Sequence, residues 1–212
     1  MNRRFASALL CGLTSLLFAA SGHAASSVDF DGSIWSLTYS GEPLAASATE
    51  ETFRISLNVD ADGYFGGFSS IDQAGFEAVR GADSFLAASL LSAPFGVSNW
   101  ELVISNTTGD GCIDSSNGAV CASSVNVFSS GVPVPTDGPG IDYQWVFDLS
   151  VTPGGLETRA DEAQLRARFA GPGDAKHLYV GQVTLVPEPG SYALLLAGLA
   201  LVTLGVRRRG NR

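Results

Sequence analysis

The chain has 212 residues, 45% of them hydrophobic, and a formal net charge of −9. Residues 25–185 are more acidic, because 6 basic residues stand there against 20 acidic ones, which gives a formal charge of −14. Such a surface repels nucleic acid and anionic lipid, keeps an exported protein soluble and attracts divalent cations. We therefore expect no nucleic-acid partner, although solvation alone is enough to explain the charge.

Residues 1–24 have the layout of a secretory signal peptide. The basic start, the apolar run over residues 5–20 and the small residues Gly22 and Ala24 match the three parts of such a peptide. The mature chain is expected to begin near Ala25. An uncleaved N-terminal anchor is the alternative.

The region 25–185 is expected to form one all-β domain, an antiparallel β-sandwich of the jelly-roll kind. Apolar and polar residues alternate with period two, which is typical of half-buried strands. The strand candidates are 34–39, 53–59, 64–68, 76–79, 99–105, 120–128, 143–151, 163–169 and 178–185. Short strands separated by Gly, Pro, Asn and Asp indicate two packed sheets. The one helix-tolerant stretch is 84–91.

A candidate cation site follows the strand that begins at Phe53. Asn58, Asp60 and Asp62 place oxygen ligands at alternate positions before Gly63, as in the first half of a calcium loop. The second half is missing, because Ser69 stands where a bidentate glutamate is needed. A simple hairpin turn from Asp60 to Gly63 explains the same residues, and a weak calcium site is the alternative. No other cofactor is expected.

Two cysteines remain after the signal peptide, Cys112 and Cys121. Export leads to an oxidising compartment, and the intervening Asn117-Gly118 pair favours a tight hairpin that brings the sulfurs together. We predict one disulfide, with two reduced thiols as the alternative. A zinc site lacks the histidine partners that it needs.

Catalytic motifs are absent from the sequence, so we predict no enzymatic activity. His177 is the one histidine after residue 24, and no nucleophile elbow, zinc-protease motif or phosphate-binding loop occurs. A glycan hydrolase with paired carboxylates is left open. The large aromatic residues share their phase with core positions, so burial is expected rather than a sugar-binding platform; they are Trp35, Trp100 and Trp145.

The tail after residue 185 has three parts in a fixed order. Prolines in Val186-Pro187-Glu188-Pro189 end the preceding fold. The uncharged run Tyr192–Val206 follows, and as a helix it is roughly 23 Å long, enough to span a membrane with help from its flanks. Arg207, Arg208 and Arg209 then keep the C-terminal end in the cytoplasm.

These residues resemble the PEP-CTERM sorting signal of Gram-negative bacteria. The resemblance implies that residues 186–212 are read by an exosortase, a membrane protease-transpeptidase that removes the helix and passes the protein outwards. It also implies a stay in the inner membrane before processing, and then a place on the cell surface or in an exopolysaccharide, biofilm-associated matrix. A permanent C-terminal membrane anchor is the competing hypothesis.

The sequence therefore predicts an exported, non-enzymatic surface or matrix protein. Its expected partners are an exosortase and an exopolysaccharide. A carbohydrate-binding module is the first alternative, and a glycan hydrolase is the second.

Overall fold

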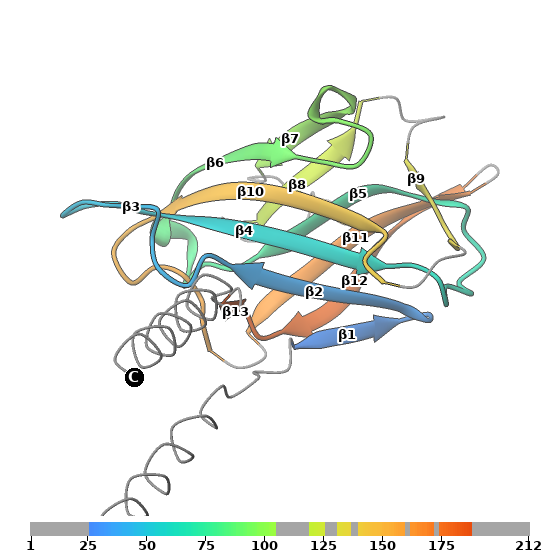
Figure 1. Ribbon diagram of the computed structural model, residues 1–212, viewed down its shortest axis with the longest axis horizontal. Coiled ribbons are helices and arrows are strands. Elements are labelled where there is room, and N and C mark those ends of the chain that lie inside the picture. The colour runs from blue at the N-terminus through green and yellow to red at the C-terminus, as the bar shows by residue number, and fades with distance from the viewer. Residues whose placement is uncertain are drawn as a thin grey trace, which may run out of the picture.

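The computed structural model describes residues 26–104, 119–125, 131–136, 140–159, 162–171 and 174–187, and their strands form two facing sheets (Figure 1). Sheet A has the order β1 (Ser27–Phe30), β2 (Ser33–Tyr39), β4 (Glu51–Asp60), β10 (Tyr143–Val151), β6 (Phe85–Ser92), with β3 (Ala45–Ala46) beside β4 and β13 (Val186–Pro187) beside β2. Sheet B has the order β12 (Asp174–Val183), β11 (Ala163–Gly171), β5 (Ser70–Glu77), β8 (Ala119–Ser124), β7 (Trp100–Ile104), with β9 (Val132–Pro133) beside β5. The short 3-10 helices are η1 (Ala82–Ser84) and η2 (Val97–Asn99).

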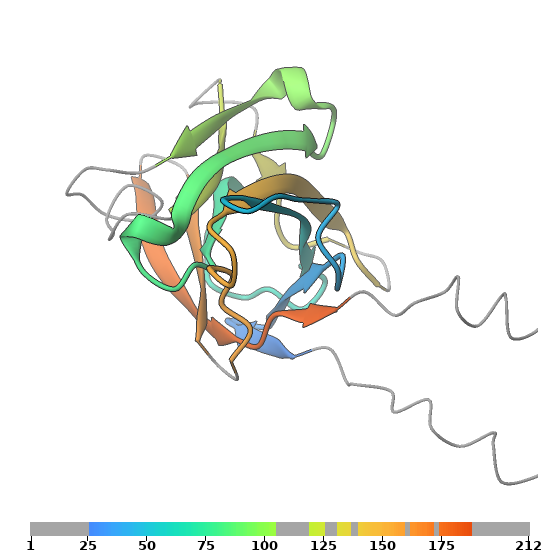
Figure 2. The same ribbon diagram turned by 90° about the vertical axis from the view of Figure 1, so that its left-hand side faces the viewer.

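The described strands pair antiparallel except for β13, which runs parallel to β2. The expected all-β sandwich is thereby confirmed as two antiparallel sheets. Seen from the side in Figure 2, the strands curve around an interior that the core side chains fill.

Alternation in the sequence decides which side chains enter the core. Along β10 the side chains of Tyr143, Trp145, Phe147, Leu149 and Val151 are buried and those between them are not. Phe147 meets Phe76 of β5 edge to face at 5.2 Å, which joins sheet A to sheet B. Full burial of one large apolar side chain is worth about 1.5–3 kcal/mol, so the buried side chains between the two sheets carry much of the stability of the fold.

Most predicted strands are confirmed, with boundaries shifted by a few residues. The candidates 34–39, 53–59, 99–105, 120–128, 143–151, 163–169 and 178–185 correspond to β2, β4, β7, β8, β10, β11 and β12, and residues 105 and 126–130 lie outside the described part. The candidate 76–79 overlaps only the end of β5, which begins earlier, at Ser70.

Two local predictions are wrong. Residues 64–68 form a loop, because Gly66 and Gly67 interrupt the aromatic run and Tyr64 stacks on Phe169 at 5.2 Å rather than pairing as a strand residue. In the helix-tolerant stretch 84–91, Ser84 ends η1 and residues 85–91 belong to strand β6, because pairing with β10 outweighs the helix propensity of its leucines and alanines.

The ends of the described chain meet at one edge of the sandwich. The backbone N–H of Thr184 donates to the Oγ atom of Ser26 at 3.0 Å, and β1 lies against β12. No helix within the described ranges is long and apolar enough to cross a membrane. The predicted signal peptide 1–24 and the predicted span Tyr192–Val206 both lie outside those ranges.

Candidate functional site

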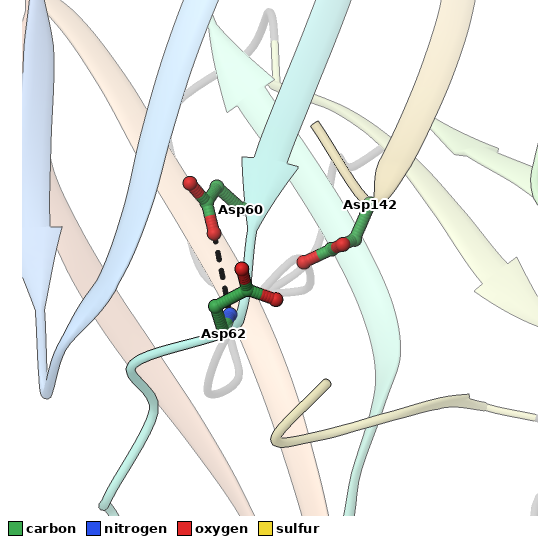
Figure 3. Close-up of side chains that lie close together, drawn as sticks. All are labelled: Asp60, Asp62 and Asp142. Atoms are coloured by element: carbon green, nitrogen blue, oxygen red, sulfur yellow. Dashed lines mark hydrogen bonds between the residues drawn. The ribbon is translucent and has the colours of Figure 1, made fainter. Parts of the chain in front are cut away.

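The end of β4 and the start of β10 bring three carboxylates together, which we call the carboxylate cluster: Asp60, Asp62 and Asp142 (Figure 3). Asp60 is the last residue of β4, and Asp142 directly precedes β10. Val59 pairs with Tyr143 in the antiparallel register, so the two aspartates necessarily lie side by side. Strand pairing, rather than a local loop motif, builds this cluster.

Each aspartate of the carboxylate cluster offers one oxygen, and the three oxygens lie within 4.8 Å of one another. All three residues are partly exposed. Like charges at this distance repel, so the arrangement favours hydrogen-bond donors or a cation nearby.

Hydrogen bonds supply part of that compensation. The backbone N–H of Ala61 donates to Asp142 Oδ2 at 2.7 Å, and that of Asp62 donates to Asp60 Oδ1 at 3.2 Å. The Thr136 hydroxyl lies in hydrogen-bonding position to both Asp62 Oδ1 and Asp142 Oδ2. Because a hydroxyl has one hydrogen, it serves only one of the two carboxylates at a time.

Carboxylate and hydroxyl oxygens are the ligands that calcium prefers, and calcium tolerates irregular geometry. The structure joins Asp60 and Asp62 with Asp142, while Asn58 has other partners. Its Oδ1 accepts from Gln144 Nε2 at 2.8 Å, and its amide nitrogen donates to the Ser56 carbonyl at 3.4 Å. Calcium binding at the cluster stays a prediction.

The prediction of a simple hairpin with its turn from Asp60 to Gly63 is wrong. The strand before this turn, β4, belongs to sheet A, whereas the next strand, β5, belongs to sheet B. The sequence analysis did not include Asp142 or Thr136 in the candidate cation site. One signal pointed to Asp142: it directly precedes a strongly alternating strand, as Asp60 ends another. Thr136 has no such signal, since a loop delivers it.

Burial alters the acid–base behaviour of a neighbour of this cluster. Tyr143 is 8% exposed, and its hydroxyl donates to the Pro133 carbonyl at 2.8 Å. Desolvation raises the pKa of Tyr143 above its usual value of 10.0, and the charge of Asp142 raises it further. The phenol therefore stays neutral beside the carboxylates.

The other predicted features differ in how far the structure describes them. Cys121 is disulfide-bonded and fully buried on β8, whereas Cys112 lies outside the described residues, so the predicted partner is not identified. Gly75 faces Cys121 across the β5–β8 pair, where a Cβ atom would collide with the Cys121 sulfur. The backbone of β5 thus leaves room for that sulfur.

The aromatic residues considered as sugar platforms lie in the core. Trp35 and Trp145 are completely buried, and Trp100 is 5% exposed and packs edge to face on Trp145 at 5.2 Å. Within the described part of the chain, the strongly exposed aromatic side chains are Phe65 and Phe95. The expected burial of the tryptophans is confirmed. His177 lies in β12.

The predicted sorting motif begins inside the fold. Val186 and Pro187 form β13, and Val186 is 8% exposed. Glu188, Pro189, Arg207, Arg208 and Arg209 lie outside the described residues.

Residues 185–209 match the family model described as the PEP-CTERM protein-sorting motif. The tail is similar to the PEP-CTERM sorting motif. A PEP-CTERM motif implies an exported protein that an exosortase sorts. The match begins at Leu185, directly before β13, so it overlaps the described fold by Leu185 and the two residues of that strand. A search of curated proteins found no match to the chain.

Proposed function

We propose that this protein is a non-enzymatic structural component of the cell envelope or of an exopolysaccharide matrix, delivered there by exosortase processing of its tail. The observation that carries the proposal is the PEP-CTERM match over residues 185–209. The processing enzyme removes the apolar run and releases the β-sandwich from the inner membrane to the outside.

The character of the β-sandwich supports a structural role. Within the described residues most of its aromatic side chains pack in the core, including the Trp100–Trp145 and Phe76–Phe147 pairs, so these rings are not available to stack on a sugar chain. The strong negative charge of residues 25–185 keeps the exported domain soluble until it reaches its destination.

Processing is tested by the mass of the mature protein. We expect wild-type protein from the envelope or medium to lack Tyr192–Arg209. Glu188→Ala leaves the apolar run and the arginines intact, so it should insert normally yet accumulate at full length in the inner membrane. Ser191→Ala, just beyond the Val186-Pro187-Glu188-Pro189 element, is the matched control and should mature normally. A mature wild-type protein that still carries the tail supports a permanent anchor instead.

The role after sorting is tested with the purified domain, residues 25–185, and the polysaccharide of the producing organism. A structural protein stays in the matrix fraction and releases no reducing sugar. Saturable binding to the isolated polysaccharide without calcium would favour the carbohydrate-binding module. Release of reducing ends, abolished by Asp142→Asn, would favour a hydrolase that works through the carboxylate cluster.

A further inference from the structure

The sorting motif starts as part of sheet A. After β12 leaves sheet B, Thr184 and Leu185 cross to the opposite sheet, where β13 lies beside the end of β2 (Figures 1 and 2). Val186 pairs with Thr38, and Pro187 pairs with Tyr39. No linker therefore separates the folded domain from the residues that the sorting machinery reads.

Side-chain burial holds this segment in place. Leu185 is 2% exposed and Val186 is 8% exposed, so both side chains point into the domain. One residue earlier, the backbone N–H of Thr184 is bonded to Ser26. The segment from Thr184 to Pro187 is thus held against the domain.

This anchoring limits what an enzyme can reach. Val186 and Pro187, the first two residues of the Val186-Pro187-Glu188-Pro189 element, are held in sheet A by their pairing with Thr38 and Tyr39. A protease cleft that takes an extended peptide contacts the backbone and alternate side chains on both sides of its target. The Val186 side chain cannot fill such a cleft while it is buried in the domain.

We propose that the β13–β2 pairing is a gate on processing: the exosortase acts on a chain only after β13 has detached from β2. This inference rests on the proposed exosortase processing and adds its regulation. In the docked state the folded domain shields the first half of the motif. The rate of maturation then scales with the fraction of molecules in which β13 is open.

The pairing has the properties of a releasable contact. It spans two residues at a sheet edge, and Pro187 has no N–H to donate. Parallel pairing is also slightly less stable per residue than antiparallel pairing. Short edge segments of this kind open locally without unfolding the core.

An insertion tests the gate in the opening direction. Gly-Ser-Gly-Ser placed between Leu185 and Val186 leaves Val186-Pro187-Glu188-Pro189 unchanged but moves this element away from β2. We expect the full-length precursor to disappear several-fold faster in a pulse-chase experiment. The same insertion between Ala48 and Thr49, in an exposed loop, is the matched control and should mature at the wild-type rate.

A disulfide tests the gate in the closing direction. Directly paired strand residues are close enough for a disulfide, so Thr38→Cys with Val186→Cys locks β13 onto β2. We expect the locked precursor to accumulate and to mature once a reductant is added. Each single cysteine variant controls for the loss of the original side chain.

The outcomes separate the gate from the sorting itself. If the wild type loses its tail and neither the insertion nor the Thr38–Val186 disulfide changes the rate of maturation, the gate is overturned. The proposed sorting is then unaffected. Opposite shifts in the two variants support the gate. A wild-type chain that keeps its tail overturns both.

Discussion

Asp142 accepts a hydrogen bond from the backbone N–H of Ala61 at 2.7 Å, across 81 positions of sequence. The bond joins the residue before β10 to the residue after β4. It satisfies a buried backbone donor where the strand pairing ends, since Ala61 is completely buried. The Asp142 carboxylate thus has a structural role whether or not the carboxylate cluster binds a cation.

Removal of this acceptor should destabilise the domain. Asp142→Ala leaves the Ala61 N–H without its partner, and we expect the free energy of unfolding to fall by about 1–3 kcal/mol. Asp142→Asn keeps a carbonyl oxygen and should lose less. Urea unfolding measures both, with the exposed Asp83→Ala as a control that should stay near wild type. Equal effects of Asp142→Ala and Asp83→Ala would contradict the structural role.

Calcium titration distinguishes a cation site from a merely soluble acidic surface. A site at the carboxylate cluster predicts a melting temperature that rises with calcium, because free calcium at ten times its dissociation constant adds about 1.4 kcal/mol of stability. Asp60→Ala combined with Asp62→Ala should abolish the rise. Solvation alone predicts no change at any millimolar concentration.

Alkaline pH should weaken the fold through Tyr143. Burial raises the pKa of Tyr143 in the folded state, whereas the unfolded phenol ionises near pH 10. The stabilisation is therefore complete below about pH 10 and is lost as the pH rises towards the folded value. Tyr143→Phe should cost about 1 kcal/mol at pH 7, because it removes the bond to Pro133, and should reduce the loss between pH 10 and 11.

Urea midpoints at pH 7, 10 and 11 give both quantities for Tyr143. Desolvation also raises the pKa values of Tyr39 and Tyr64, so the variant should keep part of the alkaline dependence. A slope identical to that of the wild type would count against Tyr143 as a contributor.

The ion pair between Asp72 and Arg168 offers a test of buried charge. The atoms Asp72 Oδ1 and Arg168 Nε are 2.8 Å apart, and the side chains are 3% and 12% exposed. Asp72→Ala leaves a guanidinium with little access to water, so we expect a loss of roughly 3–5 kcal/mol. Asp72→Val combined with Arg168→Met should be more stable than Asp72→Ala alone. A double variant that loses the sum of the single effects would show that the charges are not coupled.

The strands were predictable where one side chain in two enters the core. The alternate positions of Trp145 and Phe147 predict the inner face of β10 without information about the neighbouring strands. Sheet membership was not predictable, because the path from Asp60 to Ser70 depends on aromatic stacking with Phe169, which lies a hundred residues later. Long-range pairing also decided the fate of 84–91 and brought Asp142 to Asp60. The alternation within a segment predicts which of its own side chains enter the core. It does not predict which other strand that segment pairs with.

The disulfide prediction concerns the partner of Cys121. Alkylation of periplasmic protein under denaturing conditions should find neither Cys112 nor Cys121 reactive until a reductant is added. In the chain-entropy model a ten-residue loop contributes about 2–3 kcal/mol, so reduction should lower the urea midpoint accordingly. Two reactive thiols before reduction would exclude the predicted bond.

The first and last strands of the sandwich share one edge, where β1 lies against β12 and β13 pairs with β2. An exported chain emerges N-terminus first, so the contact of β1 with β12 and the pairing of the end of β2 with β13 form last. The edge closes only when residue 187 is outside. Completion of the fold is therefore expected only after residues 26–187 have all been translocated.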